Sequence, residues 1–284
     1  MIEHILLADS GTGQSEQMLN ALMDLPAIQR AIVTVLHVVP PQVTSDEMQA
    51  KREEGAKTLA KAVESLHLDP NLVAVNTLLR EGDPKDEVCR VAEDINADLI
   101  IMGSRGLKRL ESILENSVSQ YVFQLSRRPM LLVKDDIYVK KINRIMVAMN
   151  SSSEAQECLK TALQLLRDIK GGKLILAHIN REFSGHRDLT PAEAEKDPVL
   201  APALAEAKRY GVTCQCSVSD GNPGEEICRI ANRANADLLL LGSPDRRPSV
   251  AKSLPDLDRL LGTSLSDYVR VYAPCPVLFT RKAG

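Results

Sequence analysis

Short apolar runs alternate with amphipathic segments along the first half of the chain. The runs are rich in Val, Ile and Leu, as strands covered on both faces are, and lie at residues 2–8, 31–39, 72–79, 98–102 and 130–134. Apolar residues recur at helical spacing over 15–24, 45–66, 84–95 and 117–126. Ser45 is the expected N-cap of the second helix, and Asp83-Pro84 opens the third. Alternating strands and helices predict a mostly parallel sheet flanked by helices.

The same pattern then starts again. RIMVAMNSSSEA mirrors HILLADSGTGQSEQ, and GKLILAHIN mirrors AIVTVLHVV. The clearest repeat pairs residues 80–104 with residues 219–243 at a constant offset of 139, with 12 identities in 25 positions. We therefore predict two tandem Rossmann-like α/β domains with five strands each, at 1–138 and 139–284, joined near Lys134 to Lys141. The pattern leaves open whether Arg181–Ala203 is an ordered helix or a flap.

A glycine turn follows the fourth strand of the first copy, in ADLIIMGSRGLKRLESILENSVSQYV. Backbone N–H groups in such a turn, with a helix N-terminus near Asn116-Ser117, form a candidate anion site. Leu107 follows Gly106 where a Walker A loop has Lys, and the GxGxxG dinucleotide fingerprint is absent. A plain strand-to-loop turn is the other interpretation. Ligands of parallel sheets collect at strand carboxyl ends, so Asp9 and Gly103 are expected side by side.

The two copies differ most at this turn. In the second copy, Asn150 replaces Asp9 and Asp245 replaces Gly106, and the loop is eight residues longer. An aspartate adds a negative charge where phosphate oxygens would lie, which costs on the order of several kcal/mol with little solvent. The second site is expected to be inactive, or rebuilt for another ligand with Arg246, Arg247 and Gly262.

Composition narrows the function classes. The net charge is −3 and only 3% of residues are aromatic, which argues against a nucleic-acid-binding face. No apolar run approaches the ~20 residues of a membrane span, and no secretory signal is visible, so a cytoplasmic protein is expected. The six cysteines form no CxxC pair and are interpreted as reduced thiols in the core, with a redox role for Cys214 and Cys216 as the lesser alternative.

No catalytic constellation is apparent. A GxSxG nucleophile motif is absent, and the repeated His37 and His178 are interpreted as structural residues. The sequence therefore predicts a protein that is not an enzyme.

These motifs resemble the universal stress protein family in a tandem two-domain form. The resemblance covers the whole chain and is carried by GDPKDEV…ADLIIMGSRG and SVSQYVFQLSRRPMLLV, and by GNPGEEI…ADLLLLGS and SLSDYVRVYAPCPVLFT in the second copy. ATP-binding members have G-x2-G-x9-G-[ST], which falls on Gly103, Gly106, Asn116 and Ser117. Asn116 departs from the third glycine, although Asn tolerates left-handed backbone and is a good N-cap.

The resemblance implies ATP or another adenine nucleotide in the first domain, with or without Mg²⁺. Asp9 would hydrogen-bond ribose or adenine, Val38 would contact the base, and the four motif residues would cradle the phosphates. Arg105 would neutralise phosphate charge, or it is a solvated loop residue. The last strands, Met130–Lys134 and Val277–Thr280, are expected to pair as a pseudo-dimer of domains or to mediate a homodimer.

Three functions follow. The first is a stress-response or signalling protein whose nucleotide occupancy alters its contacts with protein partners. The second is an interaction scaffold that binds no nucleotide, which the glycines missing at Asn116, Asp245 and Thr263 favour. The third is slow ATP hydrolysis or autophosphorylation. Neither nucleic acid nor a membrane is an expected partner.

Overall fold

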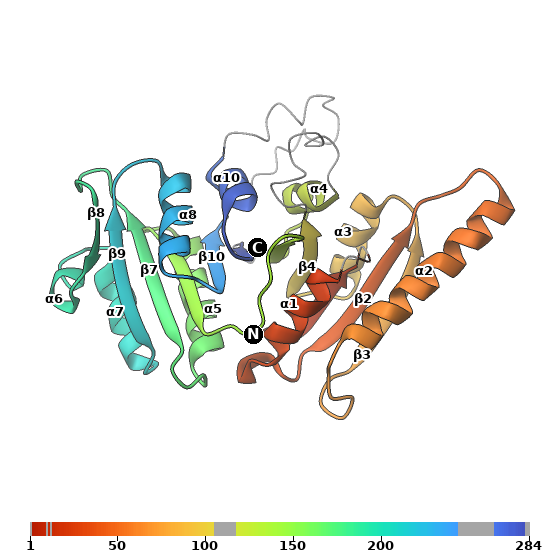
Figure 1. Ribbon diagram of the computed structural model, residues 1–284, viewed down its shortest axis with the longest axis horizontal. Coiled ribbons are helices and arrows are strands. Elements are labelled where there is room, and N and C mark those ends of the chain that lie inside the picture. The colour runs from red at the N-terminus through yellow and green to blue at the C-terminus, as the bar shows by residue number, and fades with distance from the viewer. Residues whose placement is uncertain (1, 10, 12, 105–117, 244–263, 282–284) are drawn as a thin grey trace. The chain divides into compact units, whose positions relative to one another are not determined.

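The computed structural model describes residues 2–9, 11, 13–104, 118–243 and 264–281. The chain divides into two compact units (Figure 1). The first comprises residues 1–24 and 28–140, and the second comprises residues 25–27 and 141–284. Both are α/β units with a mostly parallel sheet, which confirms the predicted fold class. The bounds 1–138 and 139–284 stay a prediction.

The first unit has a parallel five-stranded sheet in the order β3-β2-β1-β4-β5. Its strands are β1 (His4–Ala8), β2 (Ile32–Val39), β3 (Val75–Glu81), β4 (Leu99–Ser104) and β5 (Met130–Lys134). Its helices are α1 (Gln14–Met23), α2 (Ser45–Ser65), α3 (Pro84–Asp94) and α4 (Val118–Leu125), with a 3-10 turn at Pro26–Ile28. Residues 5–7 and 99–101 of the two central strands have no exposed surface, as a sheet covered on both faces requires.

The second unit differs from the expected five strands, because its sheet has six in the order β11-β10-β6-β7-β9-β8. The strands are β6 (Arg144–Met149), β7 (Lys173–Ile179), β8 (His186–Leu189), β9 (Thr213–Ser219), β10 (Leu238–Gly242) and β11 (Val277–Thr280). The helices are α5 (Ser153–Leu166), α6 (Pro191–Ala194), α7 (Leu200–Arg209), α8 (Pro223–Arg233) and α10 (Leu265–Tyr272). The additional strand, β8, pairs antiparallel with β9.

The segment Arg181–Ala203, which the sequence left undecided, forms β8, α6 and the start of α7. It occupies the place in the second unit that α2 has in the first, between the second and third parallel strands. The strand sequence HRDL contains one apolar residue and no alternation, so periodicity gave no signal for it.

The identities of the repeat hold the same backbone features in both units. Asn96 and Asn235 are the non-glycine residues with positive φ among those described, at 49° and 47°. Asp98 Oδ2 accepts hydrogen bonds from the backbone N–H of Glu3 (2.8 Å) and of His4 (3.0 Å). In the second unit, Asp237 caps the first residues of β6 in the same way. These identities are explained by folding and carry no information about a ligand.

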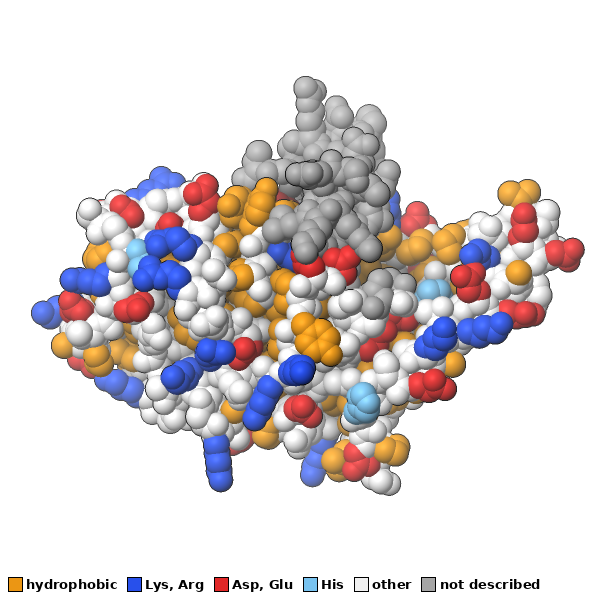
Figure 2. All heavy atoms as spheres, in the orientation of Figure 1, with side chains coloured by type: hydrophobic (Ala, Val, Ile, Leu, Met, Phe, Trp, Pro, Cys, Tyr) orange, Lys and Arg blue, Asp and Glu red, His pale blue; other side chains and the backbone are white. Residues whose placement is uncertain are grey.

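Of the two N-caps predicted for helices that the structure describes, one is confirmed and one is wrong. Asp83 accepts a hydrogen bond from Lys85 N and opens α3 at Pro84, as predicted. The cap of α2 is Thr44 rather than Ser45, since the Thr44 side chain and Glu47 form a reciprocal capping box. Figure 2 shows basic and acidic side chains interspersed along the exposed side of α2. No helix among the described residues is long and apolar enough to cross a membrane.

Candidate functional site

The first unit has its topological switch point between β1 and β4, where the strand order reverses. Asp9 directly follows β1, and Gly103 lies near the carboxyl end of β4. Ala8 is level with Met102 in the ladder, so the next residues, Asp9 and Gly103, meet at the same level. The structure therefore brings these two predicted site residues together at the carboxyl-terminal edge of the sheet, formed by the carboxyl ends of its strands, where parallel sheets bind ligands.

The Asp9 carboxylate is buried, with 7% of the residue exposed. Its Oδ1 accepts a hydrogen bond from Gly11 N at 2.7 Å, which closes a turn after β1. Its Oδ2 is also buried and has no hydrogen-bond partner among the described residues. An ionised carboxylate oxygen can only accept, so this atom has room for a donor, either a neighbouring acid in its protonated form or a ligand.

His37 supports the same turn through a hydrogen bond to its backbone. Its Nδ1 donates to the backbone carbonyl oxygen of Asp9 at 3.2 Å, since a carbonyl can only accept. This contact agrees with the structural interpretation of His37. His178 in the second unit has another role, because its Nδ1 lies 3.0 Å from Asp197 Oδ2.

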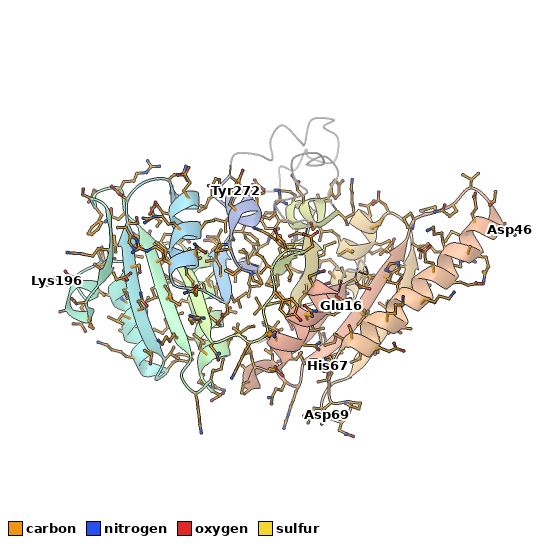
Figure 3. All side chains as sticks on the ribbon, in the orientation of Figure 1. Glu16, Asp46, His67, Asp69, Lys196 and Tyr272 are labelled. Atoms are coloured by element: carbon orange, nitrogen blue, oxygen red, sulfur yellow. The ribbon has the colours of Figure 1, made fainter. Side chains whose placement is uncertain are left out.

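A second carboxyl group, Glu16, lies beside Asp9, and sequence reasoning missed it. Glu16 is in the first turn of α1 (Figure 3), is 3% exposed, and accepts a hydrogen bond from Ser15 Oγ at 2.9 Å. Burial and then the charge of Asp9 raise the pKa of Glu16 to about 7. Burial therefore favours the neutral, protonated form of Glu16 up to near neutral pH.

The sequence held one signal for this pair. Glu16 lies three residues before Leu19, which puts it on the apolar side of α1 rather than on the solvent side. An acidic residue in the first turn of a helix ordinarily faces water and interacts with the helix dipole, so the pattern alone favoured that interpretation.

Two further buried polar atoms without a partner lie at this edge, Gln14 Oε1 and Ser104 Oγ. Gln14 Nε2 donates to the carbonyl oxygen of Asp135 at 3.4 Å, and Asp135 N donates to that of Ser104 at 3.0 Å. The start of α1 is thereby tied to the ends of β4 and β5. Beside Ser104 in the ladder, Lys134 is 4% exposed and adds a buried positive charge. Buried acceptor and hydroxyl oxygens without a partner, together with a buried positive charge, thus collect where a polar ligand would bind.

The remaining predicted site residues are placed only in part. Val38 lies in β2 one residue beyond His37, at the same edge of the sheet, and is half-buried. Asp9 N donates to Leu36 O, so Asp9 is level with His37 and Val38 lies one position further along. The other four, Arg105, Gly106, Asn116 and Ser117, lie outside the described residues.

The equivalent edge of the second unit corrects the expected pairing of Asp9 with Asn150. Met149 is level with His178, as Asp9 is with His37, so Met149 is the counterpart of Asp9 in the ladder. Asn150 comes one residue later, and its Oδ1 accepts from Ser152 N at 2.9 Å. The turn chemistry is therefore repeated, but its polar side chain is shifted by one position.

Gly242, the counterpart of Gly103, has a packing reason to be glycine. A Cβ atom there would lie 2.8 Å from Glu154 Cβ and 3.0 Å from Ala155 N, in the first turn of α5. A glycine at this position thus allows a helix to approach the strand, whether or not phosphate binds. The residues expected to disable or rebuild the second site lie outside the described ranges, namely Asp245, Arg246, Arg247, Gly262 and Thr263.

Within the described ranges, no group of three His, Cys, Asp or Glu side chains is arranged to hold a metal ion. Asp9 and Glu16 are two carboxyl groups without a third.

The comparisons with known proteins agree with the fold. The profile of the universal stress protein family matches residues 1–134 and 141–281. The universal stress protein YxiE of Bacillus subtilis is 29% identical over 150 residues, which cover 47% of this chain and all of the relative. The universal stress protein Sll1654 of Synechocystis is 29% identical over 135 residues, which cover 47% of this chain and 86% of the relative.

Solved structures extend the likeness to both units together. A universal stress protein from Archaeoglobus fulgidus has a TM-score of 0.73 and 24% identity, covering 99% of this chain and 97% of that one. A structure from Pseudomonas aeruginosa has a TM-score of 0.62 and 14% identity, covering 99% and 93%. With the tandem repeat and the two family matches, the chain belongs to the universal stress protein family.

Proposed function

We propose that the first unit binds an adenine nucleotide at its switch point, and that the protein acts in a stress response through contacts that depend on this occupancy. The observation that carries the proposal is the buried Asp9 Oδ2, which lacks a fixed donor. A ribose hydroxyl or the adenine amino group is a donor and would satisfy it, whereas an ionised phosphate is not. The nucleoside therefore belongs at Asp9 and the phosphates at the glycine turn.

The charge at the edge fits this orientation. Buried Lys134 is the last residue of β5 and is level with Ser104, the last residue of β4. It therefore lies on the same side of Asp9 as Gly103 and Ser104. Phosphate oxygens would accept from such a group and from backbone N–H groups of the glycine turn. Arg105, Gly106, Asn116 and Ser117 are proposed to complete this cradle, and Val38 to contact the base. Mg²⁺ is proposed only as an ion that the phosphates of the nucleotide bring with them.

The test is Asp9→Asn. Asn keeps an oxygen for Gly11 N and replaces the unpartnered acceptor with an amide donor, so the turn stays while the ligand contact is lost. We expect ATP or AMP affinity, measured by calorimetry, to fall about 10- to 100-fold. The matched control is Asn150→Asp, which changes the same kind of turn in the second unit and should leave affinity unchanged. Equal affinity of Asp9→Asn and the parent would contradict the proposed orientation.

A second candidate is a scaffold that binds no nucleotide, and Gly242 favours it. If packing alone explains Gly242, then Gly103 requires no ligand either. Mass spectrometry of small molecules released from the purified protein, followed by titration with ATP, AMP and cyclic dinucleotides, separates the two. Nucleotide near one per chain supports the first proposal, and no binding in any titration supports the scaffold.

A further inference from the structure

Two cysteines of the second unit lie next to each other on β9. Cys214 and Cys216 are two residues apart on the strand, so both side chains lie on one face, and their Sγ atoms are 4.0 Å apart. Cys216 is buried, Cys214 is half-buried, and both are free thiols. The pair therefore combines two thiols in contact, one of which, Cys214, reaches the surface.

The fold itself does not require thiols at these positions. Residues 139 positions earlier, in β3, are Val75 and Thr77. Cys89 and Cys228 contrast with this pair, because they recur at the same offset in α3 and α8. The second unit thus has a thiol pair where the first has a β-branched pair, so the fold that the two units share does not demand thiols here.

The backbone permits a bond between the two sulfurs. Alternate residues of an extended strand have Cα atoms about 6.6 Å apart, within the range of disulfides but near its upper end. The ladder with β8 ends at Cys216, which is level with Leu189, and Cys214 lies beyond it. On the β8 side the start of β9 can shorten without breaking a ladder bond, whereas on its other side Cys214 and Cys216 are level with Leu174 and Leu176 of β7. A disulfide formed there is strained, and strained disulfides are readily reduced.

The pKa values of the two thiols are shifted in opposite directions. A hydrogen bond from Cys214 lowers the pKa of Cys216, against the opposing effects of burial and of the Asp197 carboxylate. The same contact, with burial, raises the pKa of Cys214. Asp197 is held in place by His178 Nδ1 at 3.0 Å and by the N–H groups of Val199 and Leu200. Cys216 is thus the sulfur with more thiolate character.

We propose that Cys214 and Cys216 form a reversible intrachain disulfide on exposure to hydroperoxides. The Cys216 thiolate attacks a peroxide oxygen, the O–O bond breaks, and the alkoxide or hydroxide that leaves takes a proton from water. Cys216 is then a sulfenic acid. The Cys214 sulfur attacks the sulfur of Cys216, and the hydroxyl leaves as water with the proton of Cys214. Two thiols are oxidised, and one hydroperoxide is reduced to water and an alcohol, or to two waters.

Peptide mapping of the full-length protein tests this pair directly. Cleavage after Glu206 and Glu225 gives residues 207–225, which contain these two cysteines and exclude Cys228. After brief treatment with stoichiometric hydrogen peroxide, we expect this peptide to lose about 2 Da and to regain it with a thiol reductant. Cys214→Ser should instead give a sulfenic acid on Cys216 that dimedone traps, and Cys228→Ser should behave as the parent.

Three results would overturn the proposal. One is a peptide that gains oxygen on either sulfur without losing two hydrogens. Another is a disulfide to Cys228 or to a second chain, which appears as a crosslinked peptide. The last is an unchanged peptide at peroxide levels that oxidise exposed methionines. The measurement on the parent protein needs no variant, so a variant that fails to fold does not affect the outcome.

Discussion

At the scale of single residues, the buried pair Asp9 and Glu16 makes stability depend on pH. The pKa of Glu16 is raised from 4.5 to about 7 in the folded chain, mainly by burial and then by Asp9. Between these two values the folded state binds more protons than the unfolded state. The free energy of unfolding therefore falls as pH rises from about 4.5 to 7, and stays low above that window.

Glu16→Gln should remove this dependence. The amide carries no charge and can donate to Asp9 Oδ2, so we expect the variant to be more stable than the parent at pH 8 by about 1–2 kcal/mol, allowing for solvent screening. At pH 4.5 the two should be alike. Urea unfolding at both pH values measures this. Glu157→Gln is the control, because Glu157 is exposed in α5 and pairs with Lys160. A parent whose stability does not fall between the two pH values would contradict the pair.

At the same scale, the phosphate side of the proposal is tested by copying the second unit into the first. Gly106→Asp introduces the residue found at position 245 and places a negative charge at the proposed cradle. We expect ATP affinity to fall by at least about tenfold and AMP affinity to fall less, because AMP brings fewer phosphate charges. An equal loss for adenosine in calorimetry would show that the variant disturbs the turn rather than the charge.

At the scale of elements, the close approach of α5 to β10 explains a repeated glycine. Gly242→Ala would place a methyl group 2.8–3.0 Å from the Cβ and backbone of the first turn of α5. Such overpacking costs about 1–3 kcal/mol, which urea unfolding would detect. Gly211→Ala separates crowding from backbone strain, since Gly211 has φ +68° and open space around it. Normal stability of Gly242→Ala would restore a ligand as the reason for the glycine.

Elements also show how far the sequence predicts this fold. Apolar runs located the parallel strands of the first unit, although β3 is half-buried or exposed along its length. Asp83-Pro84 located the start of α3, because capping acts over a few residues. The polar strand β8 escaped, since its place depends on pairing with β9. The sequence also did not predict the burial of Glu16, which depends on tertiary packing. It did not predict the one-residue shift between Asp9 and Asn150, which depends on the register of the strand ladder.

At the scale of the whole molecule, nucleotide binding should divide the chain into a part that responds and a part that does not. Binding to the folded state alone adds about 2.7 kcal/mol at a ligand concentration of 100 Kd. We expect ATP to slow amide hydrogen exchange in β1, α1 and β4, while β6, α5 and β10 serve as the internal reference. Exchange measured by mass spectrometry with and without ATP shows this. Protection of both sets would mean that the second unit also binds ATP.

Pairing of the last strands and the cytoplasmic location stay predictions.

The additional strand β8 also has a consequence for solubility. A parallel sheet that ended at β9 would present seven residues of open backbone, to which another chain could add. Instead, the outermost strand of this sheet is β8, which has only four residues and includes His186, Arg187 and Asp188. A short charged border gives an incoming strand little to bind, so β8 reduces the tendency of this unit to associate through its sheet at high concentration.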